Sequence, residues 1–158
     1  MEPLRGRNGG SVSSRLEMTD RTSAGPRLVV VTLNWNGSGD TLACLDSIEV
    51  SRPDDIEVIV VDNGSEAADV ERVAGAVASR PWASLVRNPV NLGFTGGSNG
   101  GIAIALERGA QAVMLLNNDA RVEAGAFDAL LDHLEKSPEA GLISPLILDE
   151  SGERIWAA

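Results

Sequence analysis

The feature that most constrains the fold is a series of apolar runs, each followed directly by Asn, Asp or Gly. The runs are LVVVTL, VIVV and VMLL (28–33, 58–61 and 113–116), and the residues after them read NWNG, DNGS and NNDA. Continuous β-branched runs are typical of strands that are buried on both faces of a parallel sheet. Ligands of such sheets bind outside the carboxyl ends of the strands, so these polar residues are the candidate site.

Predicted helices alternate with the apolar runs. Apolar residues recur at helical spacing in the segments 38–50, 66–79, 98–109 and 123–137, and further strands are predicted over 27–35, 55–65, 82–88, 112–119 and 140–149. This alternation predicts an α/β fold, a mostly parallel sheet with helices on both faces. Residues 1–26 are rich in Gly, Ser and Arg without a hydrophobic period, so we predict a disordered tail there and one domain over residues 27–158.

Charge and composition exclude several partners. The net charge is −10; residues 1–27 hold five Arg against three acids, a charge of +2, so the rest carries −12. An acidic body repels phosphate polyanions, so we expect no nucleic-acid partner, while the weakly basic tail allows peripheral membrane contact.

The only cysteine, Cys44, cannot form an internal disulfide and is predicted to pack in the core, as in a cytoplasmic protein. No apolar run reaches the roughly 20 residues that span a membrane.

The glycine-rich stretch TGGSNGG (95–101) raises the alternative of a nicotinamide-dependent short-chain dehydrogenase, whose loop reads TGxxxGxG. Thr95, Gly96 and Gly100 match, but Ile102 stands where the last glycine belongs, and two predicted strand–helix units precede the stretch. That family also uses a catalytic Tyr, and this chain has none. The redox function is therefore a remote alternative.

The glycines need another explanation, because each Gly in a helix costs up to ~1 kcal/mol relative to Ala. Bare backbone N–H groups at a helix start would bind a diphosphate. Alternatively, the missing side chains at Gly96, Gly97, Gly100 and Gly101 permit close packing of the helix on the sheet. Both explanations stay open.

Four motifs occur in order along the chain: VVVTLNWNG, VIVVDNGS, NLGFTGGSNGGI and VMLLNNDA. Their order and spacing resemble the family 2 glycosyltransferases of the GT-A fold, most closely the bacterial rhamnosyltransferase-type members. The resemblance implies the Rossmann-like nucleotide-binding half of a GT-A fold over residues 27–158, incomplete at its C-terminal side. It also implies a role in cell-wall polysaccharide biosynthesis.

The resemblance implies that the nucleotide lies at the ends of the first two strands. Asp62 would accept a hydrogen bond from the imide N–H of uracil or thymine, and the alternative is a turn Asp that caps the next helix. Leu33, Asn34 and Trp35 stand where the family contacts the base, so Trp35 would stack on the ring. The alternative for Trp35 is a packing role.

The resemblance also implies a divalent cation, Mg²⁺ or Mn²⁺. The segment NND occupies the place of the family's D-x-D motif, so Asp119 and the amide oxygen of Asn117 would be metal ligands. The alternative is an Asx-type turn after a strand. The remaining nucleotide-binding residues that the resemblance implies are Asn91, Gly93, Gly97 and Asn118.

The function implied is transfer of a sugar from a UDP- or dTDP-linked donor to a glycan or lipid-linked acceptor, with inversion at the anomeric carbon. The general base is expected beyond Ala158, so the chain would hold the donor half and transfer sugar poorly alone. The expected location is the cytoplasm, at the inner face of the membrane if the acceptor is lipid-linked. The alternative from another class is a non-catalytic fragment that only binds a nucleotide.

Overall fold

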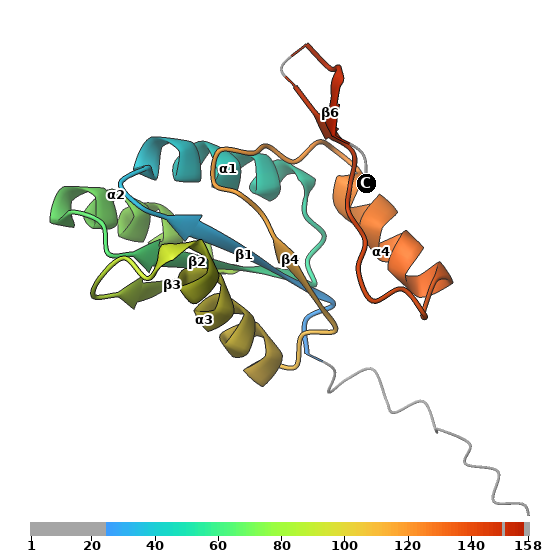
Figure 1. The fold of residues 1–158 in the computed structure, drawn as a ribbon, viewed down its shortest axis with the longest axis horizontal. Helices are drawn as coiled ribbons and strands as arrows, with labels where there is room; N and C mark the ends of the chain where they lie inside the picture. Colours follow the sequence, from blue (N-terminus) through green and yellow to red (C-terminus); the bar gives the residue numbers. More distant parts are fainter. Residues whose placement is uncertain (1–24, 150, 157–158) are drawn as a thin grey trace, which may run out of the picture.

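The computed structural model describes residues 25–149 and 151–156, so the tail predicted over residues 1–26 lies outside it apart from Gly25 and Pro26. The elements are β1 Leu28–Asn34, α1 Ser38–Ser51, β2 Ile56–Asn63, α2 Ala67–Ala78, β3 Ala83–Asn88, α3 Gly93–Glu107, β4 Ala112–Leu115, α4 Ala126–Lys136, β5 Ile147–Leu148 and β6 Arg154–Trp156 (Figure 1). Among the described residues, no helix is long and apolar enough to cross a membrane.

The first four strands form one parallel sheet in the order β3-β2-β1-β4, which confirms the predicted α/β class. β1 and β2 are the two central strands, and almost all of their side chains are buried, as their unbroken apolar runs predict. Their register places Asn34 beside Asp62, and Asp62 beside Arg87 of β3. The polar residues after the first two apolar runs therefore meet at the carboxyl ends of the two central strands.

Helices cover both faces of the sheet, as predicted. On one face, α1, α2 and α4 supply Cys44, Leu45, Ile48, Val73, Val77, Phe127 and Leu131 to a core with alternate residues of β1 and β2. On the other face, α3 packs through Ala105 against Val29, Val31, Ile59 and Val61. Alternate residues of each strand point to opposite faces, so the same two strands anchor both layers. The buried position of Cys44 confirms its predicted place in the core.

Helix α3 begins at Gly93, earlier than the predicted start at Ser98. The side-chain oxygen of Asn91 accepts the backbone N–H of Gly93 at 2.7 Å, and Gly93 has a φ of 71°, a conformation that favours glycine. The first turn carries no apolar period, so the sequence pattern missed it. A Cβ at Gly97 would lie 2.7 Å from Leu33 Cδ2, and a Cβ at Gly101 would collide with Val31, so close packing explains these two glycines.

The strand predicted over 140–149 is wrong. Only Ile147–Leu148 is extended, and it pairs antiparallel with β6 in a separate two-stranded sheet rather than joining the main one. The Asp149 carboxylate accepts the backbone N–H groups of Ser151 and Glu153, and Gly152 has a φ of 81°, so a tight turn forms directly after β5. β4 is also shorter than predicted, ending at Leu115. Because β5 does not join the main sheet, the outer edge of β4 pairs with no strand among the described residues.

Candidate functional site

Asn34, the last residue of β1, is the centre of a buried hydrogen-bond network. Its Nδ2 donates to Asp62 Oδ1 at 3.0 Å and to Asp69 Oδ2 at 2.7 Å, and its Oδ1 accepts the Thr41 hydroxyl at 2.8 Å. The side chain is fully buried, and its amide is occupied by these partners. Asn34 therefore holds the end of β2 and the start of α1 in place, and its side-chain amide is engaged within the protein.

Asp62 is the second-last residue of β2, and only 2% of the residue is exposed. One carboxylate oxygen accepts from Asn34, and the other accepts the backbone N–H of Ser65 at 3.3 Å. The residue also borders an open cleft of about 430 Å³, lined by Asp62, Gly64, Ser65, Ala67, Val70, Glu71, Arg87, Asn88 and Pro89. Each carboxylate oxygen has two lone pairs, so Asp62 can accept one more hydrogen bond from a group in this cleft.

Asp69, in the first turn of α2, is part of the same network. Its Oδ2 accepts from Asn34, and its Oδ1 accepts the backbone N–H of Ser38 at the start of α1. Burial raises the pKa of the Asp69 carboxyl, but the hydrogen bonds from Asn34 and Ser38 and the charge of Arg72 lower it, so that the net pKa lies below the ordinary value. Sequence reasoning missed Asp69, because its partners lie on other elements of the fold and no local pattern links them to it.

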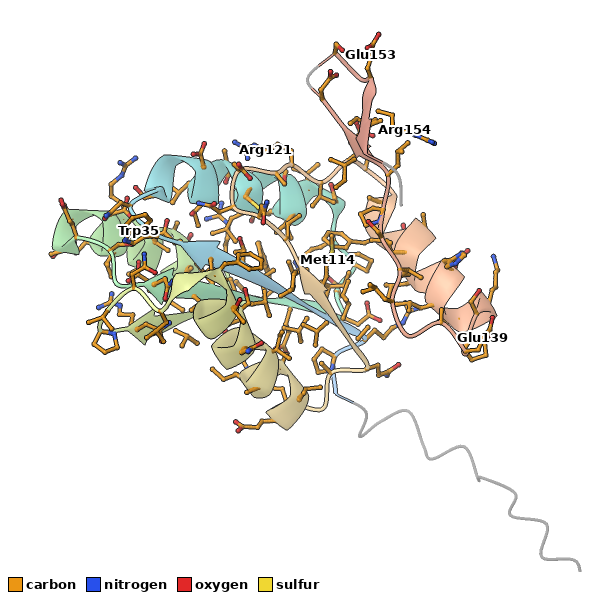
Figure 2. All side chains as sticks on the ribbon, in the orientation of Figure 1. Trp35, Met114, Arg121, Glu139, Glu153 and Arg154 are labelled. Carbon is orange, nitrogen blue, oxygen red and sulfur yellow. The ribbon has the colours of Figure 1, made fainter. Side chains whose placement is uncertain are left out.

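Trp35 follows Asn34 and points outward, with 59% of the residue exposed (Figure 2). The next residue, Asn36, has a φ of 53°, and it is held there by two hydrogen bonds: its N–H donates to Ser65 Oγ, and its Oδ1 accepts the N–H of Glu66. The turn therefore presents the indole to solvent near the carboxyl end of β1. Leu33, by contrast, packs inward against Gly97.

Asn91 and Gly93 shape the loop that leads into α3. Asn91 Oδ1 accepts from the Nδ2 of Asn63 at 3.0 Å as well as from the N–H of Gly93. Asn63 Oδ1 in turn accepts from Asn88 Nδ2 and from the N–H of Leu92, each at 3.1 Å. Asn63 and Asn88 were not predicted from sequence, although Asn63 stands next to Asp62. These amides fix the loop that borders the site.

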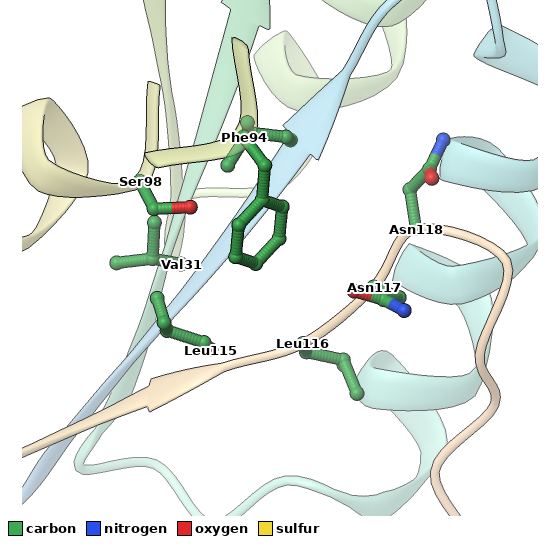
Figure 3. Close-up of a pocket in the computed structure, with 8 residues that line it drawn as sticks. Val31, Phe94, Ser98, Leu115, Leu116, Asn117 and Asn118 are labelled. Atoms are coloured by element: carbon green, nitrogen blue, oxygen red, sulfur yellow. The ribbon is translucent and has the colours of Figure 1, made fainter. Parts of the chain in front are cut away.

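The turn after β4 holds the residues predicted to bind the metal. Asn117 and Asp119 are exposed, whereas Asn118 points towards α1 and donates to Thr41 Oγ1 at 3.0 Å (Figure 3). Thr41 therefore joins Asn118 to Asn34, and through Asn34 to Asp62. We call these four residues, Asn118, Thr41, Asn34 and Asp62, the amide relay. The relay connects the β4 turn with the end of β2.

The described residues contain no group of three or more His, Cys, Asp or Glu side chains that would hold a metal ion by themselves. The β4 turn offers one exposed carboxylate, Asp119, and one exposed amide, Asn117. Such a set fits a hard cation that takes its remaining oxygen ligands from water and from the phosphates of a substrate, as Mg²⁺ commonly does. It does not fit a metal site built from protein ligands alone.

The sequence profile of Glycosyl transferase family 2 matches residues 28–157, which include the whole of this site and all ten elements. The chain belongs to glycosyl transferase family 2. The family resemblance seen in the four motifs is thereby confirmed, and the short-chain dehydrogenase alternative loses its support.

The relatives of this family 2 chain are longer than it is. An N-acetylglucosaminyl-diphospho-decaprenol L-rhamnosyltransferase of Mycobacterium tuberculosis is 29% identical over 133 residues, which cover 79% of this chain and 42% of the relative. The uncharacterized protein Mb1552 of Mycobacterium bovis is 34% identical over 90 residues, covering 57% of this chain and 30% of its own length. The chain therefore spans less than half the length of the curated relatives it matches.

A solved structure with a similar fold is the mannosyltransferase PcManGT from Pyrobaculum calidifontis in complex with GDP-Man and Mn²⁺. The TM-score is 0.57 at 22% identity, over 73% of this chain and 33% of that one. At this identity the likeness supports the GT-A fold and not a shared substrate.

Proposed function

We propose that this chain binds a pyrimidine nucleotide-sugar, UDP- or dTDP-linked, as the donor of a glycosyl transfer. The observation that carries the proposal is Asp62, a buried carboxylate held by Asn34 and by the Ser65 N–H at the edge of an open cleft. Uracil and thymine have an imide N–H, which a fixed carboxylate accepts. The exposed indole of Trp35, after the neighbouring strand, offers a flat apolar surface for the base.

The β4 turn is the proposed place of the diphosphate. Asp119 and the amide oxygen of Asn117 would hold Mg²⁺ or Mn²⁺, and a bound cation neutralises the charge of the departing nucleoside diphosphate. The protein's own contribution is to fix the turn, since Asn118 is hydrogen-bonded to Thr41 of α1. The presence of Mn²⁺ in the mannosyltransferase with the similar fold supports a divalent cation.

The proposed reaction is a single displacement with inversion at the anomeric carbon. A base would take the proton of the acceptor hydroxyl, and we place that base outside the described residues. Asp149, an acid near the C-terminal end, accepts three hydrogen bonds within its own turn and is exposed, away from the sheet edge. The decaprenol-linked substrate in the name of the mycobacterial relative supports a lipid-linked acceptor, and hence a cytoplasmic protein that works at the inner face of the membrane.

The alternative is a domain that binds the nucleotide and catalyses nothing. Both functions need the same donor site, so nucleotide binding tests what they share and turnover separates them.

The test is a thermal-shift and calorimetry panel of UDP, dTDP and GDP, each with and without Mn²⁺. Because the similar mannosyltransferase was solved with GDP-Man, GDP is the informative comparison. UDP or dTDP at 100 times its dissociation constant should stabilise the fold by ~2.7 kcal/mol, and GDP should stabilise it much less. Equal stabilisation by GDP would contradict pyrimidine selection at Asp62.

A further inference from the structure

Asparagine is followed directly by glycine at four places in the chain: Asn8-Gly9, Asn36-Gly37, Asn63-Gly64 and Asn99-Gly100. In such a pair the backbone nitrogen of the Gly can attack the side-chain amide of the Asn, because Gly has no side chain to shield that nitrogen. The attack closes a five-membered succinimide ring and releases ammonia. The first pair lies outside the described residues, and the other three have different surroundings.

Three groups of each pair decide whether the ring closes. The backbone N–H of the Gly has to lose its proton, the side-chain carbonyl oxygen of the Asn takes up negative charge, and the side-chain NH₂ group has to leave. Hydrogen bonds that occupy the N–H or the NH₂ group therefore hinder the reaction. A donor at the carbonyl oxygen favours it, as the donors of an oxyanion hole do.

At Asn36 all three groups are arranged for the reaction. Asn36 is exposed, and neither its NH₂ group nor the backbone N–H of Gly37 has a hydrogen-bond partner among the described residues. The carbonyl oxygen, Oδ1, accepts the backbone N–H of Glu66 at 2.8 Å. Glu66 is the N-cap of α2, so the positive end of the helix dipole also favours negative charge on this oxygen.

The other two described pairs are protected. Asn63 is buried, and both ends of its amide are occupied, since Oδ1 accepts two hydrogen bonds and Nδ2 donates two. Asn99 is exposed, but Gly100 lies inside α3, where intrahelical hydrogen bonds occupy the backbone N–H groups. Each of these pairs has to open locally before its ring can close.

We propose that Asn36 is a self-modification site, at which the folded chain deamidates without an enzyme. The Gly37 nitrogen passes its proton to solvent and bonds to Cγ of Asn36, the bond from Cγ to Nδ2 breaks, and Nδ2 leaves as ammonia. One water molecule then opens the ring at either of its two carbonyl carbons. The products are aspartate or isoaspartate at position 36, and in isoaspartate the main chain runs through the former side chain.

The isoaspartate product lengthens the main chain by one carbon between Trp35 and α1. The N–H of Ser38, at the start of α1, donates to Asp69, so the added carbon displaces one side of the buried network. It also displaces the turn that presents the exposed indole of Trp35 (Figure 2). We expect the isoaspartate form to be less stable than the unmodified chain and to bind UDP more weakly. The UDP readout rests on the proposed function, whereas the modification itself does not.

The test is mass-spectrometric peptide mapping of the full chain during storage in mildly alkaline buffer, where replacement of NH₂ by OH raises the mass of a peptide. Asn36 should react at least about tenfold faster than Asn63 or Asn99, because a local opening that costs about 1.4 kcal/mol slows a reaction tenfold. In denaturant the three pairs should react at similar rates, since the protection comes from the fold. Urea unfolding and UDP calorimetry of the separated isoaspartate fraction then measure the consequence.

Two variants test the groups at Asn36. Asn36→Gln keeps an amide but would have to close a larger ring, so the mass gain at this position should disappear. Glu66→Pro removes the N–H that binds Oδ1, and the φ of −64° at Glu66 suits proline. We expect it to slow the reaction by about tenfold, less than the loss of a donor in a water-excluded oxyanion hole. Glu66→Ala keeps the N–H and is the matched control, with an unchanged rate.

Equal rates at Asn36, Asn63 and Asn99 in the folded wild type would overturn the proposal, as would a faster reaction at Asn63 or Asn99. An unchanged or faster reaction in Glu66→Pro, with its folding checked by urea unfolding, would contradict the part assigned to the Glu66 N–H. The mapping needs no ligand. If the chain binds no nucleotide, the proposed function is wrong, and the modification is still decided by the three rates.

Discussion

Asp62 and Asp119 both lie after apolar runs that build the same sheet, yet their surroundings differ. Asp62 is buried, and both of its carboxylate oxygens already accept hydrogen bonds. Asp119 is exposed, and its carboxylate accepts no hydrogen bond from another described residue. The difference follows from strand position, because β2 is central, with a strand on each side, while β4 lies at the edge.

The comparison indicates that the two ends of the site are preorganised for ligand binding to different extents. The β2 end is fixed before any ligand arrives, so binding there loses little conformational entropy. The β4 end has its backbone positioned by Asn118 but leaves Asn117 and Asp119 open. On this account, a rigid part of the protein recognises the nucleobase. The site at the diphosphate end becomes complete only when the cation and the donor bind.

The largest expected effect is a loss of stability on removal of the Asn34 side-chain amide, at the buried end of the site. Asn34→Ala would leave Asp62, Asp69 and Thr41 without their shared partner, so we expect the free energy of unfolding to fall by about 2–4 kcal/mol. Asn117→Ala, at the exposed end, should change it by less than about 0.5 kcal/mol. Urea unfolding of both variants gives the comparison, and losses of equal size would contradict a difference in preorganisation.

The next largest effect concerns binding at Asp62. Asp62→Ala should weaken UDP or dTDP binding by about 1.5–3 kcal/mol, as for a hydrogen bond to a charged group. Asp128→Ala, which removes an exposed acid from the first turn of α4, is the matched control and should leave binding unchanged. Calorimetry on the folded variants checks this, and an unaltered affinity in Asp62→Ala would remove Asp62 from the nucleotide site.

A smaller effect is expected in the middle of the amide relay. Thr41→Val keeps the shape of the side chain but leaves Asn34 Oδ1 and Asn118 Nδ2 without the hydroxyl between them, so we expect a stability loss of about 1–2 kcal/mol. It should also weaken the Mn²⁺ enhancement of nucleotide binding, because Asn118 holds the β4 turn. Thr41→Ser retains the hydroxyl and should restore both properties. An unchanged stability of Thr41→Val would contradict a role for the hydroxyl in the relay.

The smallest expected effect is a pH dependence from Asp69. Its pKa is lowered in the folded state, so its contribution to stability is present above the unfolded carboxyl value of about 3.9 and is lost as the pH falls through the folded value. Urea unfolding between pH 5 and pH 2 should show this loss below about pH 4. Asp69→Asn should make that part of the profile flatter than Asp128→Asn does, and identical profiles would contradict a role for Asp69 in the network.

Periodicity predicted the parts of the fold that depend on local pattern. The buried strands, the position of Asp62 at a strand end and the helices on both faces all follow from runs of apolar residues. The role of Asn34 could not be predicted from such runs, because its partner Asp69 lies on α2 and contacts it only in the tertiary fold. The segment 140–149 was misread because an apolar run fits a strand, while the turn at Asp149 that ends it depends on side-chain hydrogen bonds.

The most direct test of the two-ended site is the affinity of the chain for uridine and for UDP, each with and without Mn²⁺, in wild type, Asp62→Ala and Asp119→Asn. We predict that uridine binds independently of Mn²⁺ and needs Asp62, while UDP binds more tightly with Mn²⁺ and loses only that gain in Asp119→Asn. If Asp119→Asn retains the full Mn²⁺ gain, or if UDP binding is indifferent to Asp62, the assignment of the base to β2 and the cation to the β4 turn is wrong.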